Sequence, residues 1–269
     1  MVAFPHCKIN LGLHVIKKRD DGYHDIETCF YPVSWTDILE VIKADQFSFS
    51  SSGTAVPGKE EDNLCIKAYK LLQHQFNLSP VKIHLHKILP MGAGLGGGSS
   101  DAAFTLRLLN SVFDLKLSIN QLQNFASQLG SDCAFFVDDK PMIGSGRGEV
   151  LTQTAISLKG YYLVLVKPDI HVSTAEAYAG VKPAQPSIAL DEILTRPIEQ
   201  WKDSLFNDFE KSVFSKFPAI AAIKNELYTH GALYSSMSGS GSTVFGIFKE
   251  PVDLREQYSQ MHYWAGYLN

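Results

Sequence analysis

The sequence predicts an α+β protein, an α/β two-layer arrangement in two lobes, because strand-like and helix-like segments are mixed along both halves of the chain. Residues 81–86 alternate apolar and polar side chains, as a half-buried strand does. Residues 161–166 form a continuous apolar run, which is typical of a buried strand. Residues 62–76 place apolar side chains at helical spacing instead. These three patterns together favour mixed secondary structure over an all-helical or all-strand fold.

The first half of the chain predicts its elements in a clear order. A short strand is expected at 37–42, and the helix at 62–76 has Asp62 as its expected N-cap. The strand at 81–86 leads into a glycine-rich segment, which is followed by a helix at 102–113. Ser118 and Gln121 form an expected capping box for a further helix that Gly130 should close.

The second half repeats this mixture after a turn. Three glycines in 144–148 mark that turn, and we expect two domains there, 1–145 and 146–269, with a ligand in the cleft between them. After the strand at 161–166, residues 219–228 predict a helix. The remaining expected strands are 232–234 and 243–248.

Composition narrows the classes of function. The 269 residues are 45% hydrophobic and 19% charged, and 24 Lys and Arg against 28 Asp and Glu give a net charge of −4. A nucleic-acid or membrane surface usually needs a basic excess, so neither partner is expected. No apolar run approaches the roughly 20 residues of a membrane helix, and the first residues lack the apolar region of a secretory signal.

The cysteines agree with a cytoplasmic protein. Four of them are present, far apart and without a CxxC pair or a histidine at metal-ligand spacing. We therefore expect four free thiols in a reducing compartment.

The glycine-rich segment is the strongest chemical signal. Glycine lets a phosphate approach the backbone, and successive N–H groups followed by a helix N-terminus make an anion site. The expected phosphate-binding residues are Pro90, Met91, Gly92, Ala93, Gly94, Leu95, Gly96, Gly97, Gly98, Ser99 and Ser100.

Other interpretations of this segment remain open. It lacks the Gly-Lys-Ser/Thr ending of a Walker A loop. Gly92, Gly94 and Gly97 do satisfy the dinucleotide fingerprint, but the acidic residue expected about 20 positions later is missing from 116–120. A nicotinamide-dependent oxidoreductase is therefore a weaker alternative, and a merely flexible loop is another.

Three segments in order resemble the motifs of the GHMP kinases, the galactose, homoserine, mevalonate and phosphomevalonate kinase superfamily. They are 5–14, 90–100 and 236–243, so the resemblance covers essentially the whole chain. It implies a two-lobed kinase fold with the active site in the cleft, and ATP and Mg²⁺ as cofactors. The first motif departs from the usual Pro-Ala-Lys, because His6 and Cys7 separate Pro5 from Lys8.

Further motifs resemble one branch of that superfamily. These are Asp-Gly-Tyr-His at 21–24, the segment 129–136 and Gly-Arg-Gly-Glu at 146–149. The branch phosphorylates the 2-hydroxyl of a cytidine diphosphate-linked methylerythritol in the non-mevalonate isoprenoid pathway, so this small molecule is the expected partner. Another GHMP small-molecule kinase is the nearest rival, and a catalytically silent binding protein on this fold is a third.

The resemblance also implies residue roles. Asp132, which follows Gly130 and precedes an apolar segment, would be the catalytic base, and Lys8 would stabilise the alkoxide as it forms. From the residues alone, Asp132 could equally cap a helix and Lys8 could be a solvated strand residue. No all-protein Mg²⁺ cage is evident, and neither Ser100 nor Asp101 is singled out as a ligand. The expected substrate-binding residues are Asn10, Tyr23, His24, Thr174, Tyr178, Gly239 and Ser240.

Overall fold

The computed structural model describes residues 1–269, which form two compact units that are discontinuous in sequence. Unit 1 comprises Met1–Cys7, Trp35–Met91 and Gly96–Lys140, and unit 2 comprises Lys8–Ser34, Gly92–Leu95 and Pro141–Asn269. Each unit therefore gathers segments that are distant in sequence. The expected domain boundary near residue 145 stays a prediction.

Unit 1 contains a four-stranded sheet. Its order is β1-β4-β6-β5, with β5 parallel to β6 and the other pairs antiparallel. The strands are β1 (Val2–Ala3), β4 (Ile38–Lys43), β5 (Ser48–Gly53) and β6 (Val81–Lys87). Along β6 the apolar side chains are buried and those between them are more exposed, which confirms the half-buried strand predicted at 81–86.

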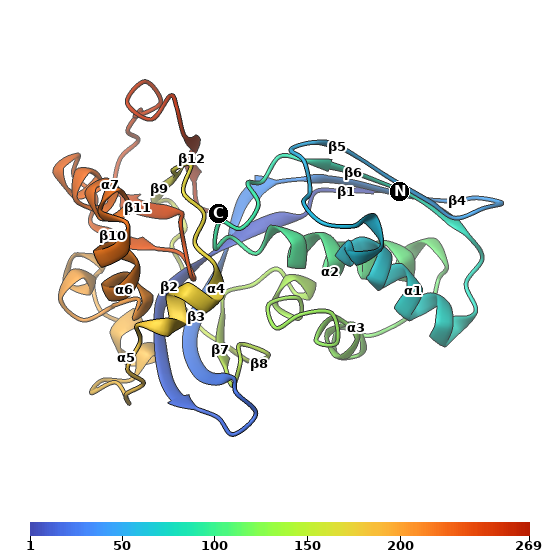
Figure 1. Cartoon of the computed structure of the whole chain (residues 1–269), viewed down its shortest axis with the longest axis horizontal. Coiled ribbons are helices and arrows are strands. Elements are labelled where there is room, and N and C mark those ends of the chain that lie inside the picture. The colour runs from blue at the N-terminus through green and yellow to red at the C-terminus, as the bar shows by residue number, and fades with distance from the viewer. The chain divides into compact units, whose positions relative to one another are not determined.

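Three helices lie along one face of this sheet (Figure 1). They are α1 (Leu64–Phe76), α2 (Gly97–Val112) and α3 (Ile119–Ala126), with short 3₁₀ turns at Glu60–Asp62 and Phe135–Val137. Alternation in the strands and 3.6-residue periodicity in the helices thus bury complementary apolar faces in two layers.

The helix ends differ from the sequence-based predictions in three places. Asn63, not Asp62, caps α1, because its side chain accepts from the Cys65 N–H at 2.9 Å while Asp62 belongs to the preceding turn. Helix α2 begins at Gly97, before the predicted 102, because Gly96 takes a left-handed conformation as N-cap. The capping box of Ser118 is confirmed, but tight turns end α3 before Gly130.

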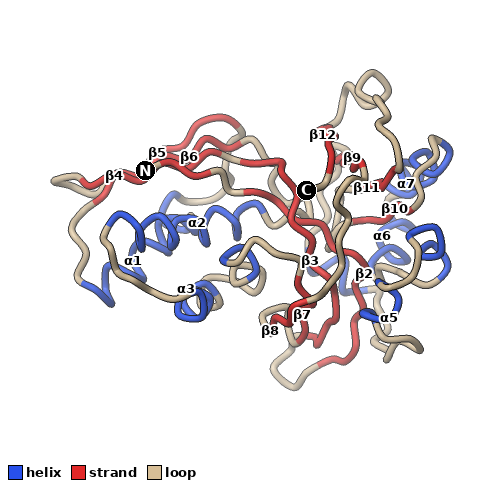
Figure 2. The backbone as a smooth tube through the Cα atoms, turned by 180° about the vertical axis from the view of Figure 1, so that it is seen from behind, coloured by secondary structure: helices blue, strands red, loops and turns tan.

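Unit 2 contains an antiparallel sheet in the order β10-β11-β9-β12. Its strands are β9 (Tyr162–Lys167), β10 (Tyr234–Met237), β11 (Val244–Phe248) and β12 (His262–Tyr267). The predicted buried strand is confirmed as β9, which pairs on both sides. Helices α6 (Phe209–Lys216) and α7 (Pro218–Thr229) lie on one face of this sheet (Figures 1 and 2) and share its apolar core.

A third sheet has the order β2-β3-β7-β8. It is made of β2 (His6–Lys18), β3 (His24–Thr36), β7 (Met142–Ser145) and β8 (Val150–Gln153), and the chain changes unit within β2 and within β3. The turn predicted from the glycines at 144–148 joins β7 to β8. Short helices α4 (Thr174–Ala179) and α5 (Leu190–Leu194) complete unit 2, together with a 3₁₀ turn at Ile198–Asp203.

The four cysteines are free thiols, as predicted. All four are buried, and burial raises the thiol pKa of Cys133 to about 12. None of the helices has both the length and the apolar character needed to cross a membrane.

Candidate active site

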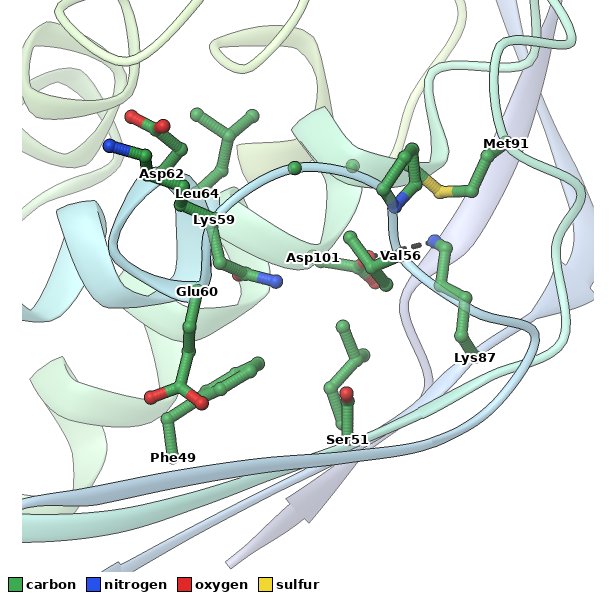
Figure 3. A pocket seen from close by; sticks show the side chains of 15 residues that line it. Phe49, Ser51, Val56, Lys59, Glu60, Asp62, Leu64, Lys87, Met91 and Asp101 are labelled. Atoms are coloured by element: carbon green, nitrogen blue, oxygen red, sulfur yellow. Dashed lines mark hydrogen bonds and ion pairs between the residues drawn. The ribbon is translucent and has the colours of Figure 1, made fainter.

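A pocket of about 290 Å³ opens in unit 1 beside the first turn of α2. Strand β5, the end of β6 and the segment before α1 form its other sides (Figure 3). Val56, Leu64 and Met91 give it apolar walls, while Asn63 and Asp101 add polar groups. Apolar walls with a few polar groups are typical of sites for flat organic molecules.

The glycines of the predicted phosphate loop serve different structural needs. Gly92, Gly94 and Gly96 have φ of +58°, +75° and +70°, a left-handed conformation that disfavours other residues. A Cβ on Gly94 would lie 2.0 Å from the Ser238 carbonyl oxygen, so the backbones approach too closely for a side chain. A Cβ on Gly98 would meet only the Leu64 Cδ1 at 4.0 Å, so the first turn of α2 is open there.

The start of α2 has the properties of an anion site. The first backbone N–H groups of a helix have no partner within the helix, and its dipole favours negative charge. Gly97 and Gly98 keep the backbone bare, and the buried Ser100 hydroxyl has no hydrogen-bond partner. A buried polar atom without a partner costs free energy, so a ligand oxygen at this turn fits the arrangement.

Asp132 lies in the turn that follows α3 in unit 1. It is half-buried, and its backbone carbonyl accepts from the Phe135 N–H at 3.3 Å. The residues immediately after it, Cys133 and Ala134, are buried, and so is Phe136. Asp132 therefore lies in a turn that leads into a buried apolar segment, and its catalytic role stays a prediction.

Lys8 is buried in unit 2, with only 3% of its surface exposed, and its position is fixed by hydrogen bonds. Its ammonium donates to the Gly94 carbonyl at 3.0 Å and to the Asn10 Oδ1 at 2.5 Å. Asn10 in turn donates to the Thr28 hydroxyl at 2.9 Å. Lys8 and Asn10 are two positions apart on β2, so they lie on one face of the strand, and both are buried rather than solvated.

The third motif packs against the same lysine network. Ser238 donates its hydroxyl hydrogen to the Gly94 carbonyl at 2.9 Å, and Asn207 donates to the Gly239 carbonyl at 2.8 Å. Gly239 is buried and Ser240 is half-buried in the loop that follows β10. Neither Ser238 nor Asn207 was predicted from the sequence as a site residue. Ser238 lies inside the 236–243 motif, which could have identified it, whereas no local pattern marks Asn207.

Two of the predicted substrate residues contact each other in unit 2. The His24 ring stacks on the Tyr178 ring, with centroids 4.6 Å apart and planes inclined by 19°. Phe209 packs edge-on against the same tyrosine, with ring centroids 4.7 Å apart. Thr174 is exposed at the first position of α4. The structure therefore brings the Asp-Gly-Tyr-His motif together with α4, although about 150 residues separate them in sequence.

Tyr23 is 55% exposed, and its ring faces a cation. The Arg147 guanidinium carbon lies 5.1 Å from the ring centroid. A turn between β2 and β3 contains Asp21 and Gly22, because Gly22 has φ of +86° and Asp21 accepts from the Tyr23 N–H at 3.1 Å. We did not assign a role to Arg147 from sequence, although the 146–149 motif contains it.

Comparison with known proteins identifies the family. The model of the GHMP kinases N terminal domain matches residues 63–140, and that of the GHMP kinases C terminal domain matches residues 189–264. A 4-diphosphocytidyl-2-C-methyl-D-erythritol kinase of Cytophaga hutchinsonii is 51% identical over 97% of both chains. The kinase of the same name from Parabacteroides distasonis is 48% identical over the full length of both.

Solved structures agree with these matches. A crystal structure of 4-(cytidine 5'-diphospho)-2C-methyl-D-erythritol kinase covers 100% of this chain and 99% of its own, with a TM-score of 0.85 and 31% identity. A mevalonate kinase with 12% identity shares the fold, with a TM-score of 0.71 over 100% of this chain and 99% of its own. The chain is therefore an enzyme of the GHMP kinase family and belongs to its 4-diphosphocytidyl-2-C-methyl-D-erythritol kinase branch.

Proposed function

We propose that this chain transfers the γ-phosphate of ATP to the 2-hydroxyl of 4-diphosphocytidyl-2-C-methyl-D-erythritol, a step of the non-mevalonate isoprenoid pathway. The observation that carries the proposal is the full-length similarity, near 50% identity, to kinases named for that substrate. The residues expected to read the cytidine are all present, and His24 and Tyr178 are in contact.

The pocket of unit 1 suits the nucleotide base of the donor. Its apolar walls, Val56, Leu64 and Met91, would cover the faces of an adenine, and the side chain of Asn63 would meet its polar edge. The open first turn of α2 begins next to this pocket, since Gly98 lines both. The donor phosphates would therefore lie over Gly97 and Gly98, where the helix N-terminus favours their charge.

The metal requirement is compatible with these residues. No group of three or more His, Cys, Asp or Glu side chains is arranged to hold a metal ion. Mg²⁺ commonly keeps several waters and binds through substrate phosphates with one or two protein ligands. The unpartnered Ser100 hydroxyl is the group that we propose as such a ligand. Mg²⁺ bound there would neutralise charge on the phosphates during transfer.

Asp132 and Lys8 would carry the proton and charge changes at the acceptor. We assign Asp132 as the base that takes the proton of the 2-hydroxyl. Lys8 would stabilise the oxygen as it becomes negative, because the Gly94 carbonyl and the Asn10 amide hold its ammonium in place.

The cytidine end of the acceptor would be read in unit 2. Tyr23 and Tyr178 offer aromatic faces, and His24 offers ring nitrogens for the polar edge of the base. The Arg147 guanidinium, next to the Tyr23 ring, would pair with the diphosphate. Thr174, Gly239, Ser240 and Asn10 would complete the binding site along the methylerythritol.

A substrate competition tests the proposal directly. Purified protein with Mg²⁺ and ATP should release ADP with 4-diphosphocytidyl-2-C-methyl-D-erythritol but not with mevalonate or homoserine. CDP should inhibit this reaction, while ribose diphosphate, which lacks the base, should inhibit much less. Equal inhibition by the two would mean that the chain does not recognise cytosine, and turnover of another alcohol would favour a different GHMP kinase activity.

A further inference from the structure

Three charged side chains form a buried cluster on the wall of the unit 1 pocket. Lys87, at the end of β6, donates to the Asp101 Oδ2 at 2.8 Å and also pairs with Asp37 (Figure 3 shows the first of these contacts). The side chains of Asp37, Lys87 and Asp101 are 0%, 1% and 4% exposed. We call this cluster the charged triad, and the mechanism above does not use it.

The charged triad holds both ends of the phosphate loop. Asp37 accepts from the backbone N–H groups of Ile88 and Leu89, at 2.6 and 2.8 Å, directly before the loop begins at Pro90. Asp101 lies in α2 directly after the loop ends at Ser100. The Lys87 ammonium bridges the two carboxylates and so joins the entry of the loop to its exit.

Stability alone is a poor explanation for such a cluster. Removing ions from water is costly, and apolar replacements of buried ion pairs are often neutral or stabilising. One ammonium also leaves two carboxylates with a net negative charge. The buried Oδ1 of Asp101 also has no hydrogen-bond partner, which costs free energy.

Anchoring the two ends of a glycine-rich loop favours the binding of its ligand. Glycine has the largest backbone freedom in the unbound state, and ordering it on binding costs free energy. Fixing both ends beforehand lowers that cost for the ligand, which is the general effect of preorganisation. The Cβ of any other residue at Gly97 would lie 3.0 Å from the Lys87 Nζ, so the ammonium packs directly beneath the first turn of α2.

We propose that the charged triad of Asp37, Lys87 and Asp101 positions the phosphate loop and sets the affinity of the enzyme for ATP. The three are positioning residues, which act through the ends of the loop rather than by contact with the transferred phosphate. The inference rests on the proposed function in one respect, namely that ATP is the phosphate donor.

The test replaces Asp101 by Asn, which keeps the shape and one acceptor but removes the charge. The dissociation constant of a non-hydrolysable ATP analogue and the KM for ATP should both rise about tenfold, the equivalent of about 1.4 kcal/mol. The KM for the cytidine diphosphate-linked alcohol should change less than about twofold. Asp114→Asn is the matched control, because Asp114 is an exposed carboxylate of the same unit that pairs with Lys116 at 3.7 Å.

A second variant guards against loss of folding. Lys87→Met with Asp37→Asn and Asp101→Leu removes all three charges, and the amide oxygen at position 37 can still accept from the Ile88 and Leu89 N–H groups. This variant should therefore melt near the wild-type temperature and still bind the analogue weakly. Wild-type affinity in either variant, or an equal rise in both KM values, would overturn the role of the charged triad. Failure of the wild-type protein itself to bind the analogue would instead refute the proposed function, and the triad's role with it.

Discussion

Each unit buries a lysine beside the glycine-rich loop, and the two lysines are held in different ways. Lys87 of unit 1 meets two carboxylates of its own unit, so its charge is neutralised where it stands. Lys8 of unit 2 donates to the Gly94 carbonyl and to the Asn10 amide oxygen, so its contacts include the loop itself. The contacts of Lys87 lead to the backbone directly before the loop and to the helix after it, whereas Lys8 meets the loop backbone at Gly94.

The largest expected effect comes from removing the proposed base. Asp132→Asn should lower kcat by roughly 10²–10⁴, because an amide cannot take the proton of the acceptor hydroxyl. Substrate affinities should change far less. Asp138→Asn is the control in the same unit, since Asp138 only pairs with Lys140 at 3.5 Å in the turn beyond. Near-normal turnover by Asp132→Asn, measured as ADP release, would place the base elsewhere.

The two tyrosines proposed to stack on the cytosine, Tyr23 and Tyr178, give the next largest effect. Stacking of a base contributes about 1–3 kcal/mol, so Tyr178→Ala and Tyr23→Ala should each raise the KM for the cytidine substrate roughly 5- to 150-fold. Phe at either position keeps the ring and should cost much less. Steady-state kinetics with both substrates distinguishes this from a general defect, because the KM for ATP should stay unchanged. A Phe variant as weak as the Ala variant would exclude stacking as the main contribution.

Two glycines of the loop, Gly94 and Gly98, should respond differently to an added methyl group. Gly94→Ala meets the Ser238 carbonyl at 2.0 Å with φ of +75°, so it should destabilise the fold. Gly98→Ala meets nothing closer than 4.0 Å and should leave the melting temperature within a few degrees of the wild type. If phosphates lie over this turn, ATP binding by Gly98→Ala should still weaken about tenfold.

Gly98 is a sharper test of the cradle than Gly97. Gly97→Val would also fail to bind ATP if the loop is the cradle, but its side chain would press on the Lys87 Nζ and on Leu89. A loss of binding there would combine a blocked cradle with a disturbed anchor. Unchanged ATP affinity in Gly98→Ala, measured by calorimetry, would argue against phosphates at this turn.

The smallest expected effect is on the pH dependence of stability, which differs between a carboxyl group of unit 1 and one of unit 2. The Asp101 carboxyl has a pKa of about 7 in the folded chain, above its usual 3.8, so the folded state binds the extra proton between these values. Stability should therefore fall as pH rises from about 4 to 7. In unit 2, the hydrogen bond from Lys216 lowers the pKa of the exposed Glu176 carboxyl to about 2. The contribution of this carboxylate to stability is therefore lost only as pH falls below about 4.5.

Urea unfolding at pH 5 and pH 7.5 measures the difference. Between the two pH values, the free energy of unfolding of the wild type should fall by about 1–3 kcal/mol more than that of Asp101→Asn, because the variant has no carboxyl to titrate at this position. Glu176→Gln should show the same change in the free energy of unfolding between these two pH values as the wild type. Parallel profiles for wild type and Asp101→Asn would show that Asp101 titrates normally.

The local pattern of the chain determined the elements, because the forces that set them act over a few residues. Alternation predicted β6, an apolar run predicted β9, and the capping box predicted the start of α3 at Ser118. Several motifs, which contain the loop glycines, Tyr23 and Lys8 and follow one another in the expected order along the chain, predicted the family. Helix ends were less well predicted, because Asn63 and Gly96 compete with neighbouring caps.

Only the tertiary structure decided which distant groups share a buried environment. Asp37 and Asp101 look like ordinary surface carboxylates in the sequence, and 64 residues separate them, yet both bind one buried ammonium. The stacking of His24 on Tyr178 and the support of Gly239 by Asn207 depend in the same way on chain segments that meet only after folding. Burial and pairing are set by three-dimensional packing, and a charge is stabilised only by the neighbours that this packing supplies.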